Sequence, residues 1–174
     1  MAHVAYADQP SRACPKLLMF DGVNIRTQTT PEQARYWGRT VGIQGFFVNR
    51  LMGDWRNDVG RDSFNPLWVL AKRFQTLYGR QGVSDNYMKV AIWKRHDWHD
   101  EEPNRQIVQN FGHAAELAKY ADLKGLALDL EPYVPIWAGE AGGLELSGSV
   151  YRTATAIGKA MHNADPEMTL ILLQ

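Results

Sequence analysis

Short apolar runs that alternate with longer amphipathic stretches constrain the fold of this chain more than any other feature of its sequence. Such alternation is typical of successive βα units and of a parallel β-sheet. It predicts an α/β protein with about five strands, at residues 16–25, 43–51, 87–94, 125–133 and 169–173.

The stretches between these runs predict four helices. The first begins at Thr30, a good N-cap, with Pro31 at the first helical position and Gln33 in the first turn, and it ends near Gly42. In the other three, apolar residues recur every three or four positions. We expect them at residues 66–79, 103–118 and 154–161.

Two architectures fit this order of strands and helices. Residues 16–174 can form a complete, doubly wound five-stranded parallel sheet, for which the length is suitable. Alternatively, they are the N-terminal part of a (β/α)8 TIM-barrel catalytic domain, truncated after the fifth strand, since a whole barrel needs about 250 residues. The last strand is the most apolar of the five and nothing in the sequence follows to cover it, which suits the second architecture.

The fourth strand distinguishes the two, because its faces differ sharply. Leucine occupies every even position from 126 to 130, while Gly125, Ala127, Asp129 and Glu131 share the other face. We expect the leucines to contact helices and the small residues to line a crowded interior, with both acids at the carboxyl end. A closed barrel has such an interior, so the pattern favours the barrel.

Asp129 and Glu131 are the candidate catalytic residues. Their Cβ atoms are expected to lie roughly 6–7 Å apart on one strand face. Like charges this close disfavour joint ionisation, so one carboxyl group can keep its proton and protonate a glycosidic oxygen. The alternative is that both acids cap loop amides or pair with Lys94 or Arg95.

The segment from Lys124 to Glu131 resembles the strand-four signature of family 18 chitinase-like glycosidases, Asp-Gly-x-Asp-x-Asp-x-Glu. The resemblance implies a barrel glycosidase in which Glu131 is the acid and Asp129 orients the substrate. Lys124 and Ala127 stand where that signature has acids, so a carbohydrate-binding barrel without catalysis remains an alternative.

Further polar and aromatic residues are expected at the same edge of the sheet. Asp21 and Asn24 are expected to end the first strand, and Asn49 and Arg50 the second. Polar groups that converge in this way suit sugar hydroxyls, and aromatic rings next to them can stack on pyranose rings. The expected substrate-binding residues are therefore Asp21, Asn24, Asn49, Arg50, Trp93 and Tyr133.

A metal-dependent hydrolase is a further alternative, and it rests on two histidines after the third strand. His96 and His99, together with Asp129 and Glu131, have the donor atoms that zinc prefers. A pair of histidines in a loop is also common without any metal. We therefore predict no metal and no cofactor, and no strand is followed by a glycine-rich phosphate loop.

Charge and composition narrow the partners. The chain has 19 basic and 19 acidic residues, so neither nucleic acid nor a membrane surface is an expected partner, whereas a neutral carbohydrate needs no electrostatic steering. Residues 1–15 are expected to be a leader or a flexible N-terminus. Within them, residues 5–7 resemble the small-residue end of a signal peptide, which favours a secreted or periplasmic location. The oligomeric state is left open.

Overall fold

One parallel sheet of five strands forms the centre of the molecule. The computed structural model describes residues 16–60, 65–91, 96–129 and 143–173, without the side chains of residues 21, 22 and 143–147. All five predicted strands are present. The expected last residues of two of them, 92–94 and 130–133, lie outside the described residues, and the other bounds agree within a few residues. The strands are β1 (Leu18–Asn24), β2 (Gly45–Asp54), β3 (Tyr87–Ala91), β4 (Gly125–Asp129) and β5 (Thr169–Leu173).

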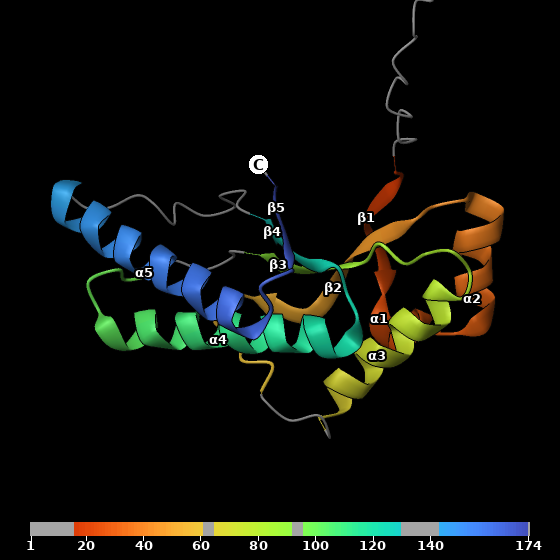
Figure 1. Ribbon diagram of the computed structural model, residues 1–174, viewed down its shortest axis with the longest axis horizontal. Helices are drawn as coiled ribbons and strands as arrows, with labels where there is room; N and C mark the ends of the chain where they lie inside the picture. Colours follow the sequence, from red (N-terminus) through yellow and green to blue (C-terminus); the bar gives the residue numbers. More distant parts are fainter. Residues whose placement is uncertain (1–15, 61–64, 92–95, 130–142, 174) are drawn as a thin grey trace, which may run out of the picture.

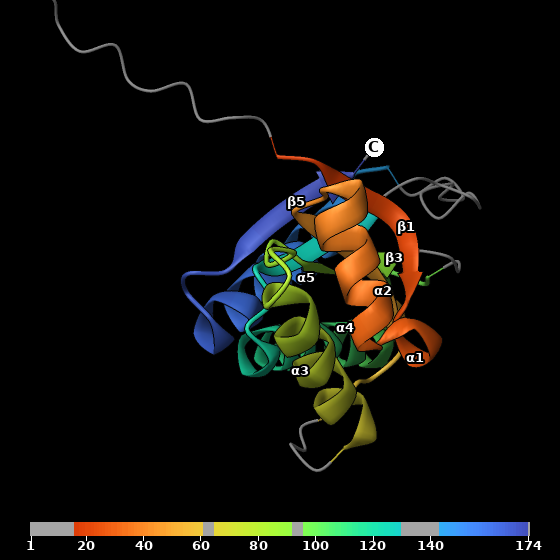
Figure 2. The same ribbon diagram turned by 90° about the vertical axis from the view of Figure 1, so that its right-hand side faces the viewer.

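The strands lie in the sheet in the order in which they occur in the chain, β1-β2-β3-β4-β5, and each pair of neighbours is parallel. The sheet curls, and β1 and β5 form its two edges (Figure 2). A sheet curled in this way has one concave face and one convex face, so the two sides of each strand meet different surroundings.

Helices follow the strands along the chain. Helices α3 and α4 lie along one face of the sheet, and α5 lies beside α4 (Figure 1). A π-helix, η1 (Tyr36–Val41), continues α2 up to Gly42, whose φ of 79° ends it. The α-helices are α1 (Ile25–Gln28), α2 (Pro31–Arg35), α3 (Pro66–Gly79), α4 (Glu101–Ala121) and α5 (Gly143–Ala164).

The four predicted helices are present, but three details of the prediction were wrong. The short helix α1 was not expected. Helix α4 begins at Glu101 rather than Pro103, because the Asp100 side chain accepts a hydrogen bond from the Glu102 amide and caps the helix. A proline is tolerated in the first turn of a helix, because the amides of that turn have no partner within the helix. Helix α5 begins at Gly143, well before Ala154.

The main apolar core lies between the convex face of the sheet and the helices. Phe46 on β2 contacts the rings of Phe74 and Tyr78 on α3 edge to face, with centroids 6.3 and 5.7 Å apart. Leu126 is fully buried in this core and Leu128 packs against it. The prediction that the leucines of the fourth strand face the helices is therefore confirmed for Leu126 and Leu128, whereas Leu130 lies outside the described residues.

On each strand, the residues that alternate with those of the apolar core point to the concave face. Phe20, Phe47 and Tyr87 are paired in register across β1, β2 and β3, and their ring centroids lie 5.9 and 6.0 Å apart. Next to them on β4 are Gly125 and Ala127, both buried as predicted. The strand that carries Asp129 thus has the two unlike faces that its sequence indicates.

Strand β2 contains an irregularity that corrects the predicted end of this strand. It does not end at Asn49 and Arg50 but continues to Asp54, with a shift of register between Val48 and Gly53. Arg50 has a φ of 65°, a left-handed conformation that is uncommon for residues other than glycine. The extra residues let the strand bulge and then pair with β3 again, so a different side chain stands at its carboxyl end.

Candidate functional site

The carboxyl ends of β2, β3 and β4 meet at one edge of the sheet. In the register of the strands, Asp54 is the neighbour of Ala91, and Ala91 is the neighbour of Asp129. Registered neighbours point to the same face, and two strand spacings separate the outer pair, about 9–10 Å between their Cα atoms. Two carboxylates therefore stand at the same level of the concave face, with only an alanine between them.

Asp129 forms a buried ion pair with a lysine of the neighbouring strand. The Nζ atom of Lys89 lies 2.9 Å from Oδ2 of Asp129, and the two side chains are only 5% and 1% exposed. Lys89 precedes Ala91 by two residues and so lies on the same face of β3. Charges buried to this degree are stable only when they are paired, so each holds the other in place.

Lys89 also contacts an aromatic ring. Its Nζ atom lies 4.0 Å from the centroid of the Phe20 ring on β1, which is a favourable position for a cation against the face of a ring. The ammonium group therefore has contacts with side chains of both β1 and β4. Lys89 is not among the predicted site residues, because a lysine within a strand gives no sign of its partner, which is distant in sequence.

Asp54 is not among the predicted site residues either, since the second strand was expected to end before it. Oδ1 of Asp54 accepts hydrogen bonds from the backbone amide and from Nε of Arg56, at 3.1 and 3.3 Å. The Asp54 carbonyl accepts a hydrogen bond from the Asn57 amide, so a turn follows the strand. An aspartate followed by this turn chemistry is a signal that could have marked the true end of β2.

Of the other predicted site residues, some lie where we expected them and some do not. Asn24 does end β1, where its side chain accepts a hydrogen bond from the Arg26 amide and caps α1. Asp21 lies in the middle of β1 rather than at its end. Asn49 is the registered neighbour of Asn24, as expected for residues of adjoining strands, whereas Arg50 is exposed at the bulge.

Three of the predicted residues lie outside the described part of the chain. These are the candidate acid Glu131 and the aromatic residues Trp93 and Tyr133. The predicted interaction between Asp129 and Glu131 therefore stays a prediction. Lys94 and Arg95, the cations expected as alternative partners, are also outside it, so that alternative stays open; within the described residues, Asp129 forms an ion pair with Lys89.

The two histidines of the metal alternative have different surroundings. His96 is buried between Trp55 and Trp98, with ring centroids 5.3 and 4.6 Å away, and its Nε2 atom lies 2.7 Å from Oδ1 of Asn104. His99 is exposed. Among the residues that the structure describes, no group of three or more histidine, cysteine, aspartate or glutamate side chains could hold a metal ion.

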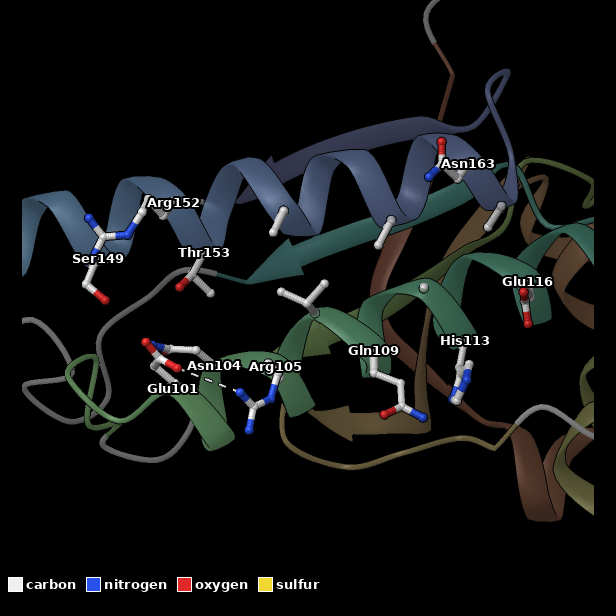
Figure 3. Close-up of a pocket in the computed structure, with 15 residues that line it drawn as sticks. Glu101, Asn104, Arg105, Gln109, His113, Glu116, Ser149, Arg152, Thr153 and Asn163 are labelled. Atoms are coloured by element: carbon white, nitrogen blue, oxygen red, sulfur yellow. Dashed lines mark ion pairs between the residues drawn. The ribbon is translucent and has the colours of Figure 1, made fainter.

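A groove of about 880 Å³ lies elsewhere, between α4 and α5. Figure 3 shows Gln109 and His113 projecting from α4, and Arg152 and Thr153 from α5. At its floor a Cβ atom on Gly112 would be 3.7 Å from Ala160. The groove belongs to the helix layer, whereas Asp129 belongs to the concave face of the sheet, so the two are separate features.

Comparison with known proteins leaves the family open, since no family model, curated protein or solved structure matches this chain. Within the described residues, no helix is both long enough and apolar enough to cross a membrane.

Proposed function

We propose that this chain contains part of a (β/α)8 barrel that hydrolyses glycosidic bonds of an oligo- or polysaccharide at the carboxyl ends of its strands. The strand order supports the barrel. Doubly wound sheets reverse their strand order at one point, which moves the following helices to the other face, whereas β1 to β5 succeed one another without reversal. Exposed Leu170 and Leu172 on β5 are side chains that a further helix of such a barrel would cover.

The position of Asp129 is the observation that carries the catalytic proposal. It is the last residue of β4, on the concave face, where barrel enzymes keep their chemistry. With Lys89 beside it, Asp129 serves as the charged partner that orients the substrate and stabilises the developing positive charge. Glu131 is then the general acid that protonates the leaving oxygen as the glycosidic bond breaks, and its carboxylate takes a proton from the water that adds to the anomeric carbon.

Leaving groups of different acidity test this division of roles. A good leaving group such as 2,4-dinitrophenolate departs without a proton, whereas a poorer one needs general acid catalysis. We expect Glu131→Gln to lower kcat/KM by hundreds-fold on phenyl glycosides, on the order of general acid catalysis, and far less on 2,4-dinitrophenyl glycosides. Asp129→Asn should lower both rates alike.

Glu32→Gln is the matched control, because Glu32 is an exposed carboxylate on α2 and should leave both rates unchanged. Equal losses on the two leaving groups for Glu131→Gln would show that Glu131 is not the acid. If the complete barrel to which this chain is proposed to belong cleaves neither class of glycoside, across a panel of common sugars, the hydrolase proposal is wrong.

A carbohydrate-binding barrel without catalysis is the second candidate. The specific observation in its favour is the nearly complete burial of Asp129 with Lys89, because a buried ion pair also fits a purely structural role. Oligosaccharide binding in calorimetry, with no release of reducing ends after long incubation, would favour this candidate over the hydrolase.

A further inference from the structure

We propose that Lys89 is the positioning residue of this site: its ammonium group keeps the Asp129 carboxylate ionised and fixes its orientation. What Asp129 then does to a substrate rests on the proposed function. The pairing itself is a property of the sheet and can be tested without any substrate.

Strand register explains how the two groups meet. Lys89 is paired with Ala127, and Ala91 is paired with Asp129. Asp129 therefore lies two residues further toward the carboxyl end of the sheet than the registered neighbour of Lys89. The lysine side chain spans this offset along the concave face and places Nζ 2.9 Å from Oδ2. The Lys89 side chain thus points toward the edge of the sheet where the candidate site lies.

Small residues on β4 make room for this side chain. Ala127, the registered neighbour of Lys89, is fully buried and presents only a methyl group, and Gly125 presents no side chain. A larger residue at position 127 would compete with the lysine stem for the same space. The small residues of β4, from which we expected a crowded interior, therefore leave room for the stem of Lys89.

Burial makes the ion pair of Lys89 and Asp129 persistent. A lysine and an aspartate that are both at least 95% buried lose the solvation that stabilises isolated charges, and their mutual attraction compensates only while both are charged and close together. The face of the Phe20 ring adds a second favourable contact for the ammonium. Each contact holds the cation at one position beside the carboxylate.

The chemical consequence concerns which group can give a proton. A carboxylate that is held ionised accepts hydrogen bonds and stabilises positive charge, so it cannot be the acid that protonates a leaving oxygen. That proton has to come from another group. In the proposed hydrolase, Lys89 thereby separates the roles of the two acids of the strand-four segment, while it touches no substrate itself.

Carbonyl-carbon NMR of protein labelled at the aspartate side-chain carboxyl groups tests the pairing directly. The Asp129 resonance is identified by its loss in Asp129→Asn. We expect it at the position of an ionised carboxylate at pH 7 in the wild-type protein and in Lys89→Arg, which keeps a cation. In Lys89→Met, which keeps the length of the stem but not the charge, it should move away from its wild-type position, because the cation 2.9 Å from Oδ2 is gone.

Kinetics supply the second readout, on 2,4-dinitrophenyl glycosides. Lys89→Met should lower kcat about tenfold or more with KM little changed, Lys89→Arg should restore most of the loss, and Lys72→Met, at an exposed lysine on α3, should have no effect. A loss of stability without any change of kcat per folded molecule would reduce Lys89 to a structural role and overturn the proposal.

The two proposals fail in different ways. If the wild-type Asp129 resonance lies at the protonated position, or if Lys89→Met leaves it unmoved, the inference about Lys89 is wrong whatever the activity. If the resonances behave as expected but the complete barrel cleaves no glycoside, the proposed function is wrong and the pairing stands. The wild-type resonance decides the first point even if Lys89→Met does not fold.

Discussion

The backbone of Thr169 on β5 passes so close to Gly125 on β4 that a Cβ atom at position 125 would lie 1.9 Å from the Thr169 carbonyl oxygen. Gly125 also has a φ of 148°, which side chains of L-residues rarely adopt. Both facts concern the first residue of the strand that ends at Asp129. The glycine therefore allows β4 and β5 to approach each other at the start of the candidate site strand.

Gly125→Ala should therefore destabilise the protein strongly. We expect a loss of about 3 kcal/mol or more in the free energy of unfolding, since both steric overlap with backbone and an unfavourable φ contribute. Urea denaturation measures it. Gly79→Ala is the control, because a Cβ atom at the end of α3 meets nothing within 4 Å, and its effect should stay within about 1 kcal/mol. Equal effects of the two changes would contradict the steric argument.

The side chain of Asn86 carries a second structural prediction. It is fully buried; its Oδ1 accepts a hydrogen bond from the Phe46 amide at 2.9 Å, and its Nδ2 donates to the Val83 carbonyl and to Oε1 of Gln75 at 2.8 and 2.7 Å. Asn86→Ala leaves buried polar groups without these partners, so we expect a loss of about 2–4 kcal/mol.

Thermal and urea unfolding of Asn86→Ala measure that loss, with Asn163→Ala on the exposed surface of α5 as the control. A change below about 0.5 kcal/mol, the range of ordinary surface substitutions, would show that Asn86 does not hold the start of β3 to β2.

Local sequence patterns predicted the strands well because each strand is a short apolar run, and a run of this kind is readable without knowledge of the partner strand. The predicted end of β2 was wrong, and the error has a physical cause. Asn49 and Arg50 are polar and resemble a strand end, and only pairing with β3 beyond the bulge carries the strand on to Asp54. Sequence periodicity contains no information about such pairing.

The candidate site was predicted only in part, because some of its features depend on strand pairing as well as on local sequence. Strict alternation along β4 placed Asp129 correctly on the interior face, since strand geometry alone determines which side a residue faces. Its partner Lys89 depends on the register between β3 and β4, which no local pattern specifies. The burial of His96 beside Trp55 and Trp98 likewise depends on tertiary contacts, which the spacing of the two histidines does not reveal.

Acid should weaken a contact between the segment after β2 and helix α4. Nδ1 of His113 lies 2.7 Å from Oδ1 of Asp58. Partial burial raises the pKa of Asp58, but hydrogen bonds from His113 and from the Gly60 amide, with the charge of His113, outweigh it and leave that pKa below its ordinary value of 3.8. A lowered pKa in the folded state means that ionised Asp58 stabilises the fold above pH 3.8 and that this contribution disappears as the pH falls through the lowered value.

The stability difference between the wild type and Asp58→Asn, measured by urea denaturation at a series of pH values, should thus be present at pH 5 and vanish in strong acid. Glu167→Gln, at an exposed acid beyond α5, should show no such trend. A difference that stays constant down to the lowest pH would contradict the ionic origin of the contact.

Alkali should affect Tyr78, which is fully buried on α3. Its hydroxyl donates a hydrogen bond to the Gln28 carbonyl at 2.9 Å, and its ring stacks on Phe74 with centroids 4.3 Å apart. Burial raises the pKa of Tyr78 to about 12. The neutral phenol therefore stabilises the fold fully below pH 10, the ordinary value, and this contribution is lost as the pH rises from 10 towards 12.

Absorbance of tyrosinate during alkaline titration should thus show a late step near pH 12 that is absent in Tyr78→Phe and retained in Tyr151→Phe, at an exposed tyrosine on α5. Tyr78→Phe also leaves the Gln28 carbonyl without this donor, so it should cost about 1 kcal/mol at neutral pH. The late step and the stability loss test the same contact, which ties the end of α1 to α3. A titration in which Tyr78→Phe keeps the late step would assign that step to another tyrosine and contradict the burial of Tyr78.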